Sequence, residues 1–219
     1  MIEFVLVSGF FWVPIIWFMM TLGFRITRSV EQIELVNDVS QMFARGIDFS
    51  TASNQTLLTG TLAADFGMVG NGGNAVTGGT SGPLAIVLSQ YFYVNSADPS
   101  CNGCANRNQT VLERRIIIGN NTLIGASGTP ASVGTIPAAN LNTTTGTCEQ
   151  ADNNLPPPTT GTATTCQYTV TQIQVGSSFS SVMTNLPTNA GGNVGGTVFF
   201  VESYFKDLTG RLNYQKSID

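Results

Sequence analysis

Residues 1–48 read MIEFVLVSGFFWVPIIWFMMTLGFRITRSVEQIELVNDVSQMFARGID, and this stretch organises the fold. From Phe4 to Phe24 it carries no charge, and only Ser8 and Thr21 have polar side chains. About 20 apolar residues in a helix, each rising about 1.5 Å, are enough to cross the hydrocarbon core of a bilayer. The apolar run begins at the first residue and continues into an amphipathic helix instead of ending in a cleavage site. These features favour a membrane-spanning helix over a signal peptide.

Glu3 is an acid at the tip of this apolar run. An ionised carboxylate in hydrocarbon is costly, so a residue of this kind usually has a partner and a function. One interpretation places Glu3 in the headgroup layer, where the positive end of the helix dipole favours an acid. The other interpretation pairs Glu3 with a positive group, and the first candidate is the α-amine of a neighbouring identical chain.

The N-terminal residues also resemble a known family. Glu3-Phe4-Val5-Leu6-Val7, followed after a short apolar interval by Pro14 and a continuing helix, resembles the N-terminus of the TadE-like proteins of the type IV pilin superfamily. The resemblance implies a prepilin that a prepilin peptidase cleaves just before the apolar helix. It also implies that Glu3, with Phe4 beside it, guides subunit assembly. The family's glutamate usually lies slightly further from the mature end, so either a residue or two are missing before Met1 or the processing register differs.

Pro14 has a physical consequence of its own. Inside a helix it removes the hydrogen bond to the carbonyl of Phe10 and clashes with that turn. Because Gly9 lies nearby, we expect a weak or kinked segment from Ser8 to Pro14. A simple kink is one interpretation, since neighbouring helices can satisfy the freed backbone groups in a membrane. The resemblance implies a second, because a similarly placed proline in type IV pilins marks where the helix stretches within the filament.

The second half of the long helix, residues 25–48, is amphipathic. Its apolar residues recur at helical spacing and are Ile26, Val30, Ile33, Val36, Val39, Met42 (or Phe43) and Ile47. Arg25 and Arg28 lie at the membrane edge, where their side chains can reach headgroups. We therefore expect one helix with an apolar half over residues 1–24 and an outer half packed on a globular extracellular head of residues 49–219.

The head is predicted to begin with a helix and to continue with strands. Gly46 is the expected stop of the long helix, and Ser50 to Ser53 supplies N-cap candidates for a shorter helix that continues to Phe66 and ends at Gly67. The strand candidates are rich in β-branched and aromatic residues and are Leu84–Val94, Val111–Ile118, Gln167–Val175 and Thr197–Phe205. Helices followed by strands predict an α+β fold with a mainly antiparallel sheet. The last two strand candidates and the loop between them loosely resemble the closing part of TadE-like proteins.

Four cysteines lie beyond the long helix, and they are Cys101, Cys104, Cys148 and Cys166. The first two could form half of a zinc ribbon, but the last two are too far apart to supply the second close pair. All four lie on the side of the membrane where pilin heads fold and disulfides persist, so two disulfides are favoured over zinc. Three connectivities are possible, and we prefer Cys101–Cys104 with Cys148–Cys166 because each pair pins a loop that cannot build a core. Closing the longer loop contributes about 3 kcal/mol in the chain-entropy model.

The composition excludes several classes of function. Charged residues make up 10% of the chain, against about 25% in ordinary soluble proteins. The net charge of −4 leaves no basic footprint for nucleic acid, and the absence of histidine removes the commonest general base and metal ligand. The acids are scattered, at Asp65, Asp98, Glu113, Asp152, Glu202 and Asp207, and no Walker lysine follows the glycine-rich segments. We therefore expect neither an enzyme nor a bound cofactor or metal.

Together with the resemblance, these features predict a structural filament subunit. Its apolar helix would lie in the inner membrane before assembly and then pack against identical subunits in a helical homopolymer, an extracellular pilus at the cell surface. The expected partners are the lipid bilayer, the prepilin peptidase and the pilus secretion machinery. The alternative is a single-pass, membrane-anchored minor pilin or assembly factor of a Tad-type system that does not form the bulk filament.

Overall fold

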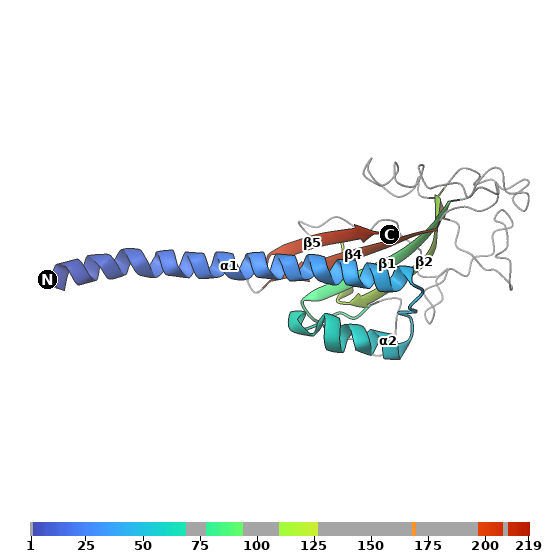
Figure 1. Ribbon diagram of the computed structural model, residues 1–219, viewed down its shortest axis with the longest axis horizontal. Helices are drawn as coiled ribbons and strands as arrows, with labels where there is room; N and C mark the ends of the chain where they lie inside the picture. The colour runs from blue at the N-terminus through green and yellow to red at the C-terminus, as the bar shows by residue number, and fades with distance from the viewer. Residues whose placement is uncertain (1, 69–77, 94–109, 127–167, 170–196, 208–209) are drawn as a thin grey trace, which may run out of the picture.

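The longest element is α1 (Ile2–Ala44), a single helix of 43 residues. At about 1.5 Å per residue it is about 65 Å long. Figure 1 shows that its N-terminal half projects away from the rest of the chain, while its C-terminal half lies along the sheet of the head. The computed structural model describes residues 2–68, 78–93, 110–126, 168–169, 197–207 and 210–219.

The end of α1 is a well-defined cap at Gly46, as the sequence predicts. Gly46 has a φ of +87°, a left-handed conformation that glycine adopts without strain. Its amide donates to the carbonyl of Phe43 at 3.0 Å, and the amide of Ile47 donates to the carbonyl of Met42 at 3.1 Å. These two bonds form a Schellman motif, and Met42 and Ile47 pack against the core beside it. The helix therefore ends at Ala44, slightly before the expected boundary.

The next helical region is shorter and less regular than expected. It consists of α2 (Ala52–Leu57), a π-helical turn η1 (Leu58–Leu62) and a 3-10 turn η2 (Ala64–Phe66). The hydroxyls of Thr56 and Thr59 donate to the carbonyls four residues earlier, at 2.8 and 2.9 Å, and such bonds bend helices. Gly60 adds a residue of low helix propensity. Gly67, with a φ of +65°, ends the region where the sequence predicts.

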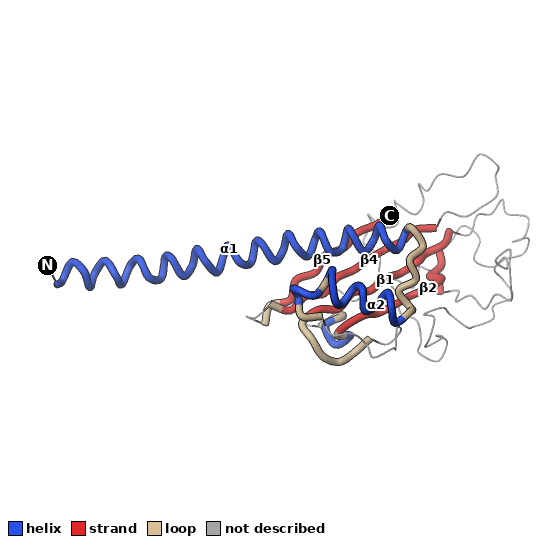
Figure 2. The backbone as a smooth tube through the Cα atoms, turned by 60° about the horizontal axis from the view of Figure 1, so that its bottom comes forward, coloured by secondary structure: helices blue, strands red, loops and turns tan. Residues whose placement is uncertain are grey.

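The head contains one antiparallel sheet. Its strands are β1 (Leu84–Tyr93), β2 (Thr110–Gly119), β3 (Tyr168–Thr169), β4 (Thr197–Lys206) and β5 (Leu212–Ile218). They lie in the order β3-β2-β1-β4-β5, and each neighbouring pair is antiparallel. Figure 2 shows β2, β1, β4 and β5 side by side. A long apolar helix, a short helix and an antiparallel sheet agree with the expected α+β class.

Three strand predictions agree closely with the observed β1, β2 and β4. The candidate Gln167–Val175 is described only at β3, and the rest of it lies outside the described residues. The edge strand β5 was not predicted at all. It pairs with β4 from Phe200 opposite Ile218 to Lys206 opposite Leu212. It therefore forms one edge of the sheet, where it contacts α1.

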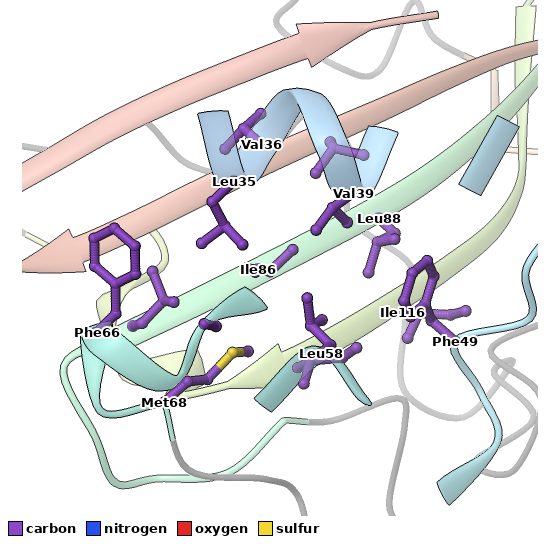
Figure 3. Close-up of a cluster of buried hydrophobic side chains, with 14 of the residues drawn as sticks. Leu35, Val36, Val39, Phe49, Leu58, Phe66, Met68, Ile86, Leu88 and Ile116 are labelled. Atoms are coloured by element: carbon purple, nitrogen blue, oxygen red, sulfur yellow. The ribbon is translucent and has the colours of Figure 1, made fainter. Parts of the chain in front are cut away.

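The main core lies between the two helices and one face of the sheet (Figure 3). Leu35 and Val39 of α1 and Leu58 beside α2 are fully or almost fully buried, as are Ile86 and Leu88 of β1. Burying a side chain of this size contributes about 1.5–3 kcal/mol relative to leaving it in water. The C-terminal half of α1 is therefore an integral part of the head.

A polar turn at Asp48 fixes the connection between α1 and α2. The Oδ1 atom of its carboxylate accepts hydrogen bonds from the amide of Ser50 at 2.9 Å and from the hydroxyl of Ser50 at 2.7 Å. The same atom accepts a third hydrogen bond from the guanidinium of Arg114 on β2. Burial opposes ionisation of this carboxyl, but the hydrogen bonds from Ser50 and the charge of Arg114 outweigh it and lower the pKa of Asp48. The turn thereby ties the end of the long helix to the sheet.

The opposite face of the sheet buries a carboxylate. Glu202 of β4 is fully buried and accepts hydrogen bonds from the hydroxyls of Tyr204 at 3.1 Å and Tyr214 at 2.9 Å. Burial and then the charge of Glu202 raise the pKa of both tyrosines. The bonds stabilise the neutral phenols and join β4 to β5.

A buried cation lies on the same face, at Arg115 of β2. Its guanidinium donates to the hydroxyls of Ser89 at 3.1 Å and Tyr91 at 3.2 Å, both on β1. Burial raises the pKa of Tyr91 to about 12, although the charge of Arg115 opposes the shift. These buried charges help to specify the register of β2 against β1 and of β4 against β5, because a one-residue slip would separate each charge from its hydrogen-bond partners on the neighbouring strand.

Candidate assembly surface

The apolar half of α1 lies outside the head, and large side chains are exposed on every side of it. They are Phe10, Phe11, Trp12, Val13, Ile15, Ile16, Trp17, Phe18, Met19, Met20, Leu22 and Phe24, with exposed fractions from 44% for Ile15 to 81% for Phe10. Soluble monomers rarely leave a continuous apolar surface of this extent in water. The surface therefore requires an apolar environment, from lipid or from protein.

The hydroxyl of Thr21, within this segment, and that of Thr27, just beyond it, are satisfied by the helix itself. The hydroxyl of Thr21 donates to the carbonyl of Phe18 at 2.9 Å, and that of Thr27 donates to the carbonyl of Gly23 at 3.1 Å. Internal satisfaction of this kind is the condition for a segment that lies in hydrocarbon. Among the described residues, α1 from Gly9 onward is the one helix long and apolar enough to cross a membrane. Its length, composition and position near the N-terminus suit either membrane insertion or a signal sequence.

The three predicted assembly residues lie at separate points along α1. Glu3 and Phe4 are in its first turns, and their side chains lie outside the described part of the chain. Pro14 lies about 16 Å further along, and the helix continues through it without a break. The fold therefore places Pro14 within the exposed apolar half and does not bring it beside Glu3.

The helix leaves the head at Arg28. One nitrogen of the Arg28 guanidinium donates to Glu31 at 3.1 Å and to the backbone carbonyl of Asp65 at 2.9 Å. The guanidinium also lies 5.6 Å from the centre of the Phe66 ring, which packs edge-on against Phe205 of β4. These contacts link α1 to η2 and to the sheet. Toward the N-terminus, α1 projects away from the head (Figure 1).

The outer half of α1 has two apolar faces rather than the single face predicted. The head covers Leu35, Val36, Val39 and Phe43, but it leaves Ile26, Val30 and Ile33 between 43% and 57% exposed. At 100° per residue, the centre of this exposed set lies about 120° around the helix from the covered set. The prediction that one apolar face over residues 26–47 packs on the head is therefore wrong for its first three members.

The exposed face continues into the apolar half as a straight line of side chains. We call this line the outer stripe, and it consists of Ile15, Met19, Leu22, Ile26, Val30 and Ile33, which are 43–67% exposed. Its steps of four and three residues cover five helical turns between the first and last member. The stripe therefore crosses the junction at Arg28 and runs beside the head.

Charged residues flank the outer stripe on its two sides. Glu34 and Asp38 are exposed on one flank, one turn apart, and neither forms an ion pair with any residue that the structure describes. Arg25 is exposed on the other flank. The helix thus presents an apolar line with an acidic flank near the head and a basic residue nearer its apolar half.

Comparisons with protein-family models, curated proteins and solved structures found no match. The arrangement of α1 therefore carries the functional argument. The four cysteines all lie outside the described residues, as do Asp98 and Asp152.

The remaining predicted acids have separate environments. Asp65 is exposed in η2, Glu202 is buried on the far face of the sheet, and Asp207 accepts from the amide of Arg211 in the turn before β5. Glu113 lies in β2, and its side chain is outside the described part of the chain. Within the described ranges, no group of three or more acids or cysteines lies close enough to hold a metal ion. The surface of α1 is the feature that calls for a partner.

Proposed function

We propose that this protein is a pilin-like structural subunit that polymerises through the apolar half of α1 into an extracellular filament. The observation that carries the proposal is one continuous helix that is built into a folded head at one end and exposes apolar side chains on every side at the other. A bundle of such helices hides this surface from water, and the heads then form a sheath around it. Lipid hides the same surface before assembly.

The position of Glu3 adds support. An acid near the start of the apolar half is costly in lipid or in a helix bundle unless a positive group neutralises it. In a filament, the α-amine of a neighbouring copy supplies that group. Removing one partner of a buried ion pair costs about 3–5 kcal/mol, because the other charge is left uncompensated.

The proposal is tested by replacing Glu3 in the full chain within cells that assemble it. Glu3→Gln should abolish filaments in the sheared surface fraction, while the protein stays in the membrane with its head folded. Asp65→Asn is the matched control, because it also removes one carboxylate but changes an exposed residue of the head. Electron microscopy and fractionation measure the outcome.

Normal filament yield from Glu3→Gln would contradict the role of this residue. If the unaltered chain stays in the membrane fraction while the cells make filaments of another subunit, the protein is instead an anchored minor pilin or assembly factor.

A further inference from the structure

We infer that the indole N–H of Trp12 in one copy of this chain donates a hydrogen bond to the backbone carbonyl of Phe10 in a neighbouring parallel copy. The inference rests on the proposed filament function, and it names a polar contact between the apolar halves of α1. Each copy uses Trp12 as the donor toward one neighbour and Phe10 as the acceptor from another.

The carbonyl of Phe10 lacks the donor that an α-helix normally provides. That donor is the backbone N–H four residues later, and Pro14 has none. A hydroxyl three residues later could replace it, as Thr21 donates to the carbonyl of Phe18 at 2.9 Å, but that position is Val13. Within its own helix, the carbonyl is therefore left without either donor.

This carbonyl lies deep in the apolar half of α1, where water cannot replace the missing donor. Pro14 is the central residue of the run from Phe4 to Phe24. Phe10 lies about 6 Å from that centre, within a hydrocarbon core that is about 30 Å thick. An unsatisfied backbone group at this depth is costly, and proline is tolerated in membrane helices where neighbouring helices satisfy the freed group.

The same segment presents donors without acceptors. The two tryptophans of the chain, Trp12 and Trp17, are 62% and 71% exposed, and neither indole N–H bonds to any residue that the structure describes. A buried indole usually finds an acceptor, and tryptophan is enriched at membrane interfaces, where polar groups are available. Trp12 lies instead about 3 Å from the centre of the apolar run. Its N–H therefore requires an acceptor that lipid tails do not provide.

The helix places Trp12 and the freed carbonyl on opposite sides. At 100° per residue, Trp12 lies about 200° around the axis from Phe10, whereas the carbonyl faces the gap before Pro14, within about 40° of Phe10. The donor is therefore about 160–200° from the acceptor. A copy that donates toward one neighbour can accept from another on its far side, so the contact repeats to a third copy and beyond.

A second copy supplies both missing partners at once. Copies anchored in one membrane run parallel at the same depth, and Trp12 lies only about 3 Å further along the axis than Phe10. Long side chains in a helix lean toward its N-terminus, which brings the indole close to the level of a neighbour's Phe10 carbonyl. We therefore expect copies in this contact to be displaced along their axes by less than about one turn, or about 5 Å.

Trp17 has the same chemistry but a different position on the helix. It lies seven residues after Phe10, which places it only about 20° from Phe10 around the axis, on the side of the freed carbonyl. A contact through Trp17 would use one side of the helix for both donor and acceptor, so it would close on two copies. Trp17 is therefore the matched control for Trp12.

Single substitutions in the full chain, within cells that assemble it, test the donor. Trp12→Phe removes the N–H and should lower filament yield in the sheared surface fraction about five-fold, the effect of losing one interhelical hydrogen bond at every contact. Trp17→Phe removes the same atoms from the other side of the helix and should keep the yield within about two-fold. Equal losses from both variants would overturn the inference, because ring packing would then explain them.

Val13→Thr tests the acceptor. This nearly isosteric change supplies a hydroxyl three residues after Phe10, the spacing at which Thr21 bonds the carbonyl of Phe18. Because the hydroxyl occupies the carbonyl, the yield should fall nearly as far as in Trp12→Phe. Combining the two substitutions should give about the same five-fold loss rather than the product of two losses, since both remove one interaction. A further loss in the combined variant would overturn the assignment of Phe10 as the acceptor.

The outcomes separate this inference from the proposed function. If the unaltered chain forms no filaments, both fail. If Trp12→Phe forms filaments at normal yield, the function stands and the contact is wrong. The amount of each variant in the membrane fraction is measured in parallel and should equal that of the unaltered chain, because Trp12 and Trp17 lie outside the head. A fall in that amount that matches the fall in filament yield would overturn the contact, because insertion rather than assembly would then be impaired.

Discussion

Two phenylalanines of the same helix are expected to respond in opposite ways to truncation. Phe43 is 3% exposed and packs edge-on against Phe199 at 5.0 Å and tilted against Phe49 at 6.5 Å, measured between ring centres. Phe18 is 66% exposed and lies outside the head. We predict that Phe43→Ala destabilises the head without a direct effect on the filament contacts, and that Phe18→Ala does the reverse.

The magnitude for Phe43→Ala follows from its surroundings. Replacing a buried phenylalanine with alanine costs about 3–5 kcal/mol, and the two ring contacts place this site toward the upper end. Since small domains have free energies of unfolding of about 5–15 kcal/mol, the variant should lose a third or more of its stability. Phe18→Ala should change the stability of the head by less than about 0.5 kcal/mol, because the ring contacts nothing in it.

The measurement is denaturant unfolding of each full-length variant in the same detergent. Near-ultraviolet circular dichroism of the buried tyrosines reports the head, whereas tryptophan fluorescence does not, because Trp12 and Trp17 both lie in the exposed half of α1. Filament yield is measured in parallel. A loss of less than about 1 kcal/mol for Phe43→Ala, or an equal loss for Phe18→Ala, would refute the packing of α1 on the sheet as the source of the head's stability.

Three further results are expected. The free energy of unfolding should fall as the pH rises above about 10, because the pKa values of Tyr91, Tyr204 and Tyr214 are raised in the fold. The stabilisation is complete below the pKa of free tyrosine and is lost for Tyr91 as the pH approaches its pKa of about 12, so a flat profile would contradict these environments. Mass spectrometry of the unreduced protein should find two internal disulfides and no metal among the four cysteines, and four free thiols or bound zinc would reverse the expectation. A chain that begins at Arg25 should remain monomeric in size-exclusion chromatography, and polymerisation as efficient as that of the full chain would show that the apolar half is only an anchor.

The elements with long, uniform patterns could be predicted from the sequence. The charge-free run to Phe24 predicts the projecting half of α1, Gly46 predicts its end, and the β-branched runs predict β1, β2 and β4. The edge strand β5 was missed because its apolar residues alternate with polar ones over only seven positions. The alternation of Leu212, Tyr214 and Ile218 was the available signal.

The two faces of the outer half of α1 could not be separated by spacing alone. A step of three residues turns a helix by 300°, so the three successive steps from Ile33 to Met42 rotate the side chains by about 180°. The apolar positions that were taken as one face thus wind from the outer stripe to the side that the head covers. The buried site of Glu202 was missed for a related reason, since one of its two tyrosine partners comes from the unpredicted strand β5.

The unbroken course of α1 through the Arg28 junction fixes the angular phase between head and stalk. Inserting one residue between Phe24 and Gln32 would turn the apolar half of α1 by about 100° relative to the head, so the residues of the outer stripe on the two sides of the insertion would no longer lie in one line. Inserting seven would turn it by only about 20° less than two full revolutions, while moving the head outward by about 10 Å. Insertions close to a whole number of helical turns therefore keep the outer stripe in one line, whereas insertions of other lengths interrupt it.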